Sequence, residues 1–263
     1  FMERNQPLIS FIHFVNTYSI WVALGSFSTY LFYCKIYTAM PNYLIALGLS
    51  LGVWFIYTLD HLLDGMQLGN TAATRRHAAH FAYKNHLKIV LLLVASILGV
   101  LAFYIPSEYY PFVGFILVLT FIHFVINYLV PQKIKKMLFL KEVYIALVVA
   151  LGFGCTPFLE VEDKWAFGDI KIYLAPLFFI NVANLILFSL FDKDADERTE
   201  TLSIAHFYNK RTLQTIVAIS LLASITYALI LWFGSHISPL ALLVLLLMQL
   251  TLMYICLVPS YFG

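Results

Sequence analysis

The sequence predicts an all-α, polytopic transmembrane helical bundle, and three observations support this fold class. Hydrophobic residues make up 62% of the 263 positions and charged residues only 11%, against about 25% in an ordinary soluble domain. Sixteen basic and 14 acidic residues are too few to coat a soluble protein of this length. The apolar residues also gather in runs of about 20, the length that crosses a bilayer as a helix. Soluble enzymes, disordered chains and nucleic-acid binders are therefore excluded as primary interpretations.

Eight apolar runs are predicted to span the membrane within a single domain that covers residues 1–263. Pro7, Pro41, Pro111 and Pro239 lie near the starts of runs, where a helix tolerates a residue without an N–H group. In chain order the predicted spans are 8–33, 42–63, 86–105, 111–130, 141–158, 171–191, 212–233 and 238–258.

The basic residues predict the orientation of the bundle. If the loops are numbered in chain order, thirteen of the 16 basic residues lie on one side, one before the first span and four in each of loops two, four and six. The other side has only Lys35, Lys164 and Lys171. Because cytoplasmic loops carry the excess of lysine and arginine, we expect both termini and loops two, four and six in the cytoplasm. The regular alternation also supports the number of eight spans.

Two of these cytoplasmic loops begin with the same acidic pattern. Asp60 and Asp64 follow the second predicted span, and Asp192 and Asp196 follow the sixth. Aspartates four residues apart share one face of a helix, where their charges repel each other. At a helix C-terminus the helix dipole opposes them as well. A single such motif is also compatible with a solvated helix end, but two in equivalent positions indicate that a cation offsets the repulsion.

The chemistry of the motifs favours magnesium. Four carboxylates are hard oxygen ligands, and Mg²⁺ bound by carboxylates readily bridges to phosphate oxygens. Basic residues close to both motifs imply that an anion is shared between the metal and the protein. The sequence therefore predicts Mg²⁺ and a phosphate-bearing substrate at the cytoplasmic interface.

With these motifs in these places, the chain resembles the UbiA superfamily of intramembrane prenyltransferases. Those enzymes are helical bundles with one Asp-rich motif after the second helix and another after the sixth. The first family motif is roughly NxxxDxxxD, and here Asp60 and Asp64 match the acids, whereas Ile56 stands at the position of the asparagine. The resemblance is thus to a divergent member.

The rest of the chain matches the family in part. The second family motif is a DxxxD followed by a polar stretch and a serine, which Asp192, Asp196 and Ser203 match. A tyrosine followed by lysines after the fourth helix is similar to Tyr128 with the lysines near 133–136, at a slightly longer spacing. The family usually has nine spans, which leaves a ninth span open.

The resemblance implies a Mg²⁺-dependent transferase that ionises a prenyl (isoprenoid) diphosphate and joins the prenyl group to a lipophilic acceptor within the membrane lipids. Metal and nearby cations would stabilise the departing diphosphate. The catalytic, metal-binding aspartates would be Asp60, Asp64, Asp192 and Asp196, and the candidate substrate-binding residues are Arg75, Arg76, Tyr128, Lys133, Lys136 and Asn184.

Several of these roles have alternatives that the sequence leaves open. Arg75 and Arg76, like the loop-four lysines, suit either a diphosphate or anionic lipid headgroups. Asn184 shares a helix face with Asp192 and suits either the substrate cavity or an interhelical hydrogen bond. Asp194 is a further candidate metal ligand that would compensate for Ile56, or it pairs with Arg198 in solvent.

Two other functions compete with the transferase. A terpene cyclase on the same scaffold would trap the carbocation intramolecularly, and Ile56 keeps this alternative open. A non-enzymatic carrier would hold its acids near the bilayer midplane, in broken helices, whereas these acids lie near helix ends. A di-iron enzyme would need several histidine clusters, and the sequence has one compact cluster, His77-Ala78-Ala79-His80, with His61 and His86 not far away.

Overall fold

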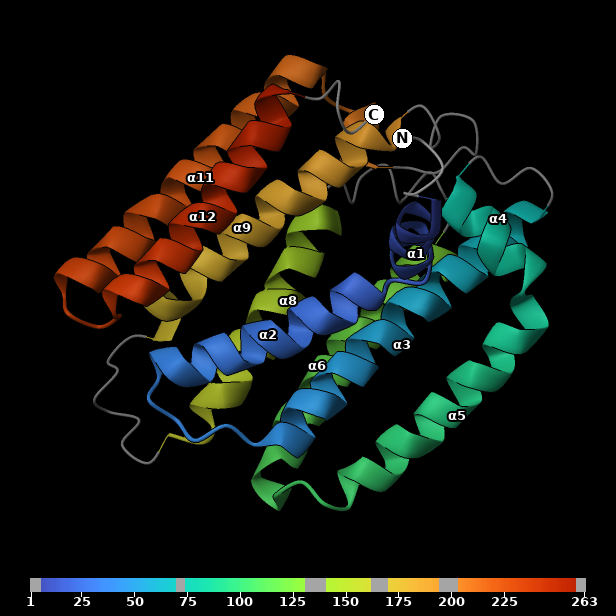
Figure 1. The fold of residues 1–263 in the computed structure, drawn as a ribbon, viewed down its shortest axis with the longest axis horizontal. Coiled ribbons are helices and arrows are strands. Elements are labelled where there is room, and N and C mark those ends of the chain that lie inside the picture. The colour runs from blue at the N-terminus through green and yellow to red at the C-terminus, as the bar shows by residue number, and fades with distance from the viewer. Residues whose placement is uncertain (1–5, 70–73, 131–140, 162–169, 194–202, 259–263) are drawn as a thin grey trace. The chain divides into compact units, whose positions relative to one another are not determined.

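The computed structural model describes residues 6–69, 74–130, 141–161, 170–193 and 203–258, and every regular element among them is a helix (Figure 1). η3 and η6 are single 3₁₀ turns, and η4 is a π-helical turn. In chain order the helices are α1 (Gln6–Thr17), α2 (Ile20–Ile36), α3 (Tyr43–Leu68), α4 (Arg75–Ala82), α5 (Lys84–Ala102), η3 (Ser107–Tyr109), α6 (Tyr110–Phe124), η4 (Val125–Leu129), α8 (Lys141–Phe158), α9 (Ile170–Phe191), η6 (Ile204–His206), α11 (Lys210–Phe233) and α12 (Pro239–Leu257).

Seven helical segments are long and apolar enough to cross a membrane: α3, α5, the continuous segment Ser107–Leu129, α8, α9, α11 and α12. They correspond to the second to eighth predicted spans. The helical fold class is therefore confirmed, and the seven segments support the predicted multi-pass membrane character. The orientation across the membrane, the number of eight spans and the single domain stay predictions.

The outer surface of the spans supports the same conclusion. Leu92 on α5 and Phe121 on α6 are each 68% exposed, and α6 has no buried residue at all. An extended apolar surface of this kind is unfavourable in water. In a bilayer it is the surface that faces the lipid, because the helices satisfy their backbone hydrogen bonds internally.

The first predicted span is wrong as a continuous helix. The run 8–33 breaks into α1 and α2 at Ser19, whose backbone adopts the left-handed conformation with φ of 56°. The break is stabilised from outside the run, since the indole Nε1 of Trp54 donates a hydrogen bond to the carbonyl of Tyr18 over 2.8 Å. The second part, α2, has 17 residues and is apolar but shorter than the seven long segments.

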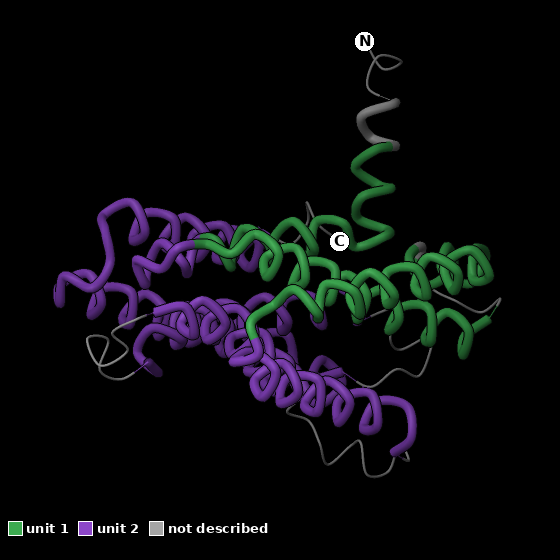
Figure 2. The backbone as a smooth tube through the Cα atoms, turned by 90° about the horizontal axis from the view of Figure 1, so that it is seen from below, with its two compact units in different colours: residues 1–31, 41–106 green, residues 32–40, 107–263 purple. Residues whose placement is uncertain are grey.

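The helices group into two compact units, which Figure 2 colours separately. Unit 1 comprises residues 1–31 and 41–106, and unit 2 comprises residues 32–40 and 107–263. In unit 1, Leu62 of α3 packs with Leu87 and Leu91 of α5 in a small buried cluster, and Tyr18 and Trp54 cover it. This packing holds the C-terminal half of α3 against the start of α5.

Unit 2 is built around α9, which packs against α8 on one side and α11 on another, with α12 beside α11 (Figure 1). Its core contains a buried polar chain as well as apolar side chains. Gln249 of α12 donates to the hydroxyl of Ser224, which in turn donates to the carbonyl of Pro176, over 2.7 and 3.0 Å. Interhelical hydrogen bonds of this kind tie membrane helices together where apolar contact alone is not selective.

Candidate functional site

The first acidic motif lies inside a helix rather than at its end. α3 was predicted to end near residue 63, but it continues to Leu68 and ends at Gly69, whose φ of 56° suits a residue without a side chain. Asp60 and Asp64 are therefore held on a rigid helix, one turn apart, and both are partly buried. α4 packs against this part of α3.

A close approach of two backbones brings α4 onto α3. A Cβ atom at Gly65 would lie 2.8 Å from the carbonyl oxygen of His77 and 3.2 Å from the backbone nitrogen of Phe81. Only glycine fits without displacing α4. At the start of α4, the Thr74 hydroxyl accepts a hydrogen bond from the His77 N–H, which caps the short helix. His77 is thereby held over the last turns of α3.

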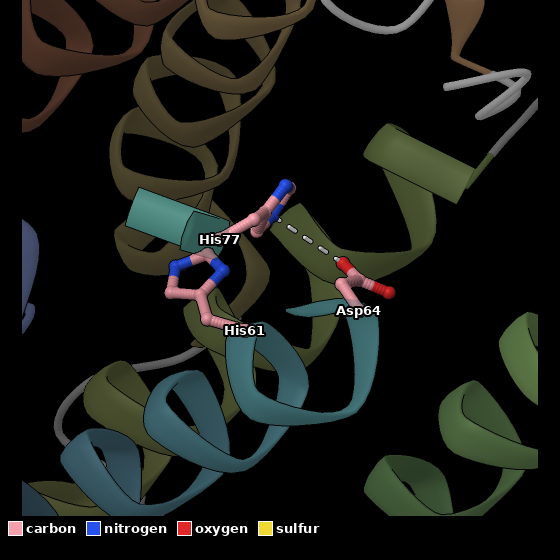
Figure 3. Close-up of side chains that lie close together, drawn as sticks. All are labelled: His61, Asp64 and His77. Carbon is pink, nitrogen blue, oxygen red and sulfur yellow. Dashed lines mark ion pairs between the residues drawn. The ribbon is translucent and has the colours of Figure 1, made fainter. Parts of the chain in front are cut away.

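This packing places two histidines beside the motif (Figure 3). His61, Asp64 and His77 each offer one ligand atom, and these three atoms lie within 4.8 Å of one another. Within the cluster, Nε2 of His77 lies 3.7 Å from a carboxylate oxygen of Asp64. His61 is 9% exposed, and the side chains of His77 and Asp64 are 16% and 24% exposed. The cluster is thus partly shielded from solvent.

The histidines of α4 are electrically neutral at pH 7. Burial lowers the pKa of His77, and the Arg76 guanidinium and His80 lower it further, whereas the Asp60 carboxylate raises it. Burial also lowers the pKa of His80, against the hydrogen bond from its Nδ1 to the Arg76 carbonyl, which raises it. Since the ordinary histidine pKa of about 6.5 already lies below 7, both rings carry a free lone pair. The contact between His77 and Asp64 is then a polar approach rather than an ion pair.

Arg76 brings a positive charge to the same place. Its guanidinium lies 3.3 Å from Nε2 of His61. A guanidinium has no acceptor atom, so the nitrogen of His61 must accept this bond and the ring must carry its hydrogen on Nδ1. One guanidinium, two carboxylates and three imidazoles therefore gather at one end of α3.

The oxygen donors at this end of α3 fit a magnesium ion. Mg²⁺ is usually bound by one or two carboxylates, with substrate phosphates and water completing the shell. Asp60 and Asp64 offer carboxylates on one helix face, and Arg76 offers a donor for the phosphate. These three residues would hold the metal and the anion.

The second motif lies in unit 2. Asp192 comes directly after the last residue of α9, its N–H donates to the Phe188 carbonyl over 2.9 Å, and its side chain is exposed. Asp194 and Asp196 lie outside the described residues. Because the two motifs belong to different units, their predicted convergence on one diphosphate stays a prediction.

A buried glutamate holds both ends of the second motif segment. Glu142 of α8 is 5% exposed, and its Oε1 accepts from the Ser189 hydroxyl over 3.1 Å and from the Ile204 N–H over 3.0 Å. Ser189 precedes the segment and Ile204 follows it. Ser203, the serine of the predicted motif, caps η6 together with His206 in a reciprocal capping box. The glutamate therefore fixes where the segment leaves α9 and where it returns.

The other predicted site residues are dispersed. Tyr128 lies in η4, where its ring stacks on Phe124 with centroids 5.9 Å apart. Asn184 is half-buried in α9, two turns before Asp192. The backbone of Arg75 begins α4, and Lys133 and Lys136 lie outside the described residues. The substrate-binding roles of these residues stay predictions.

Comparisons with known proteins found no relative of this chain. No family model, no curated protein and no solved structure matches this chain. The resemblance to the UbiA superfamily therefore depends on the two motifs and their placement.

Three parts of this arrangement were not predicted from the sequence. The first is the pairing of His61 and His77 with Asp64, the second is Gly65 as the contact point for α4, and the third is Glu142. An HxxH next to a DxxxD is the only sequence signal that points to the first. Glu142 follows Lys141 at the start of a span and has the appearance of an ordinary interfacial acid.

Proposed function

We propose that the protein is a Mg²⁺-dependent membrane transferase that ionises a prenyl diphosphate and transfers the prenyl group to a lipophilic acceptor. The observation that carries the proposal is the end of α3, where Asp60 and Asp64 lie partly buried one turn apart with the Arg76 guanidinium close by. Paired carboxylates with a cation in the last turns of an apolar helix suit a metal-bound anion whose apolar part enters the membrane. A second motif of the same spacing begins at Asp192 and supports the same role.

The proposed reaction has two steps, departure of the diphosphate and attack of the acceptor on the remaining allylic cation. The bond between the first prenyl carbon and the diphosphate oxygen breaks, and the diphosphate leaves with the electron pair. Bound Mg²⁺ would supply charge neutralisation for this leaving group. Asp60 and Asp64 would hold the metal ion that binds the headgroup, and Arg76 would donate hydrogen bonds to phosphate oxygens. A nucleophilic atom of the acceptor then bonds to the allylic cation and releases a proton.

A terpene cyclase on the same scaffold is the second candidate, and one residue favours it. Ile56 lies one turn before Asp60 on α3 and has no polar atom with which to contact a metal or a phosphate. In a cyclase a double bond of the same chain would attack the cation, and the new ring cation would then lose a proton or take up water, so no acceptor would be consumed.

The test is product analysis of the purified protein with Mg²⁺ and a panel of prenyl diphosphates. The transferase requires acceptor-dependent consumption of the diphosphate, with mass spectrometry showing the joined product. Release of diphosphate with a hydrocarbon or alcohol product and no acceptor would identify the cyclase. No turnover of any substrate, together with cation flux in liposomes, would instead indicate a carrier.

Matched variants make the test specific for the motif. Asp60→Asn and Asp64→Asn keep the size of the side chain but remove its charge, and each should slow turnover by about 10²–10³-fold. Glu108→Gln makes the same chemical change at an exposed carboxylate in η3 and should leave turnover unchanged. Equal activity in all three variants would disprove the role of the first motif.

A further inference from the structure

The two histidines beside Asp64 form a second kind of site, distinct from a pair of carboxylates. His61 and Asp64 lie three residues apart on one face of α3, and His77 reaches them from α4 (Figure 3). Their ligand atoms all lie within 4.8 Å of one another. Small side-chain rotations would bring three such atoms to the metal distances of about 2.0–2.2 Å that zinc sites show.

Unsatisfied nitrogens gather in the same cluster. Nδ1 of His61, Nδ1 of His77 and Nε2 of His80 are buried, and none has a hydrogen-bond partner within the described residues. Buried polar side-chain atoms are paired in the large majority of cases, and exceptions need an explanation. Nδ1 of His61 carries the ring hydrogen and Nε2 of His80 carries a lone pair, so the described residues leave the polar groups around the cluster incompletely paired.

The donor set selects the class of that group. Magnesium and calcium prefer oxygen ligands throughout, whereas imidazole nitrogens suit zinc, iron, copper and nickel. Two histidines and one carboxylate with a free fourth position are the ligand set of open zinc sites and of non-haem iron sites. We propose that His61, Asp64 and His77 bind one divalent transition-metal ion, of the Zn²⁺ type, with a fourth coordination position left open.

His80 lies next to His61 and is the candidate hydrogen-bond partner of that ligand. Its Nδ1 lies 2.9 Å from the Arg76 carbonyl, which can only accept, so its Nε2 carries the lone pair. The His80 ring lies at a steep angle to that of His61, with centroids 5.5 Å apart. When His61 binds metal through Nε2, its Nδ1–H needs an acceptor, and His80 offers one. Outer partners of this kind fix the orientation of metal-binding histidines.

Arg76 opposes the metal. Its guanidinium occupies Nε2 of His61 over 3.3 Å and adds a positive charge beside the ligands. Metal binding through this nitrogen requires the Arg76 side chain to move away. The same arginine would be drawn away by an anion such as a diphosphate, which is the only step of this inference that depends on the proposed function. Removal of the Arg76 charge should therefore strengthen metal binding.

The experiment uses Co²⁺ as a spectroscopic probe of the full-length protein in detergent, with no substrate present. One Co²⁺ per chain should bind with the intense visible absorption of a four-coordinate site, and Zn²⁺ should displace it. His77→Ala and Asp64→Asn should each weaken Co²⁺ binding at least ~10-fold, as losses at metal sites do. Arg76→Leu should bind Co²⁺ several-fold more tightly.

His86→Ala is the matched control, because His86 is an exposed histidine at the start of α5 in the same unit. It should bind Co²⁺ like the parent protein. His61→Ala removes a buried ring and is expected to destabilise the fold, so the test uses His77, whose side chain is 16% exposed. Equal Co²⁺ binding by the parent and His77→Ala, or only weak six-coordinate absorption in the parent, would overturn the proposal.

Failure of this proposal and failure of the proposed function are distinguishable. Co²⁺ binding that depends on His77, without release of diphosphate from any substrate, would support the proposed metal site and disprove the transferase. Mg²⁺-dependent release of diphosphate that His77→Ala leaves unchanged, without specific Co²⁺ binding, would do the reverse.

Discussion

The two DxxxD motifs have the same spacing but different surroundings. In unit 1, Asp60 and Asp64 lie within α3, and α4 covers them through the close contact at Gly65. In unit 2, Asp192 comes after the end of α9 with an exposed side chain, and Glu142 accepts hydrogen bonds from Ser189 before it and Ile204 after it. The difference teaches that spacing puts two carboxylates on one face, while neighbouring elements decide whether that face is a shielded site or a helix end.

The largest effect should come from the carboxylates themselves. Asp64→Asn should slow Mg²⁺-dependent release of diphosphate by about 10²–10³-fold, the cost of removing one preorganised electrostatic contact. The unfolding temperature should stay the same or rise, because one of two repelling charges is gone. Asp192→Asn sharpens the comparison: an equal loss of rate would make the motifs equivalent, and an unchanged rate would make Asp192 a solvated helix end.

The contact between α3 and α4 should be the next most sensitive feature. Gly65→Ala forces a Cβ atom to within 2.8 Å of the His77 carbonyl oxygen, and overpacking of this kind costs about 1–3 kcal/mol. Thermal unfolding in detergent should show the loss, and Co²⁺ binding should weaken as His77 is displaced.

Gly99 provides the control for this prediction. It lies in α5 of the same unit, and a Cβ atom there would meet nothing within 4 Å. Gly99→Ala should therefore leave the protein as stable as the parent or slightly more stable, because alanine favours helix over glycine. If both substitutions behave alike, α4 does not approach α3 as closely as described.

In unit 2 the corresponding test is Glu142→Leu. The Ser189 hydroxyl and the buried Ile204 N–H would each lose their acceptor, and an unsatisfied buried donor costs about 1–3 kcal/mol. Amide hydrogen exchange at Ile204 should become faster. Glu142→Gln keeps an oxygen that accepts both bonds and should retain slow exchange, whereas equally fast exchange in both variants would show that the charge is what matters.

The smallest effects should come from the helix caps, which have the same chemistry in both units. Thr74 caps α4 by accepting from the His77 N–H over 3.2 Å, and Asn209 caps α11 by accepting from the Thr212 N–H over 2.9 Å. Loss of such a cap costs about 1 kcal/mol. Thr74→Ala should also weaken Co²⁺ binding, because it loosens the helix that carries His77. Asn209→Ala should leave Co²⁺ binding unchanged, and a loss there would contradict the assignment of the metal site to unit 1.

The spans were predictable because hydropathy is a property of consecutive residues. Seven of the eight predicted runs match long apolar helical segments, and Pro111 and Pro239 lie in the first turns of α6 and α12 as expected. The break at Ser19 was not predictable. No proline or glycine marks it, and its stabilising contact comes from Trp54, 36 residues beyond Tyr18.

The sequence by itself determined the all-helical fold class, which follows from the apolar composition. It also determined the helix face that Asp60 and Asp64 share, which follows from the 3.6-residue period of a helix. Only the tertiary structure decided what lies opposite that face. His77 reaches Asp64 because Gly65 lets two backbones approach, and Glu142 reaches Ile204 across 62 residues of chain. Contacts between distant residues depend on how whole helices pack, and packing is determined by side-chain shapes from many positions at once.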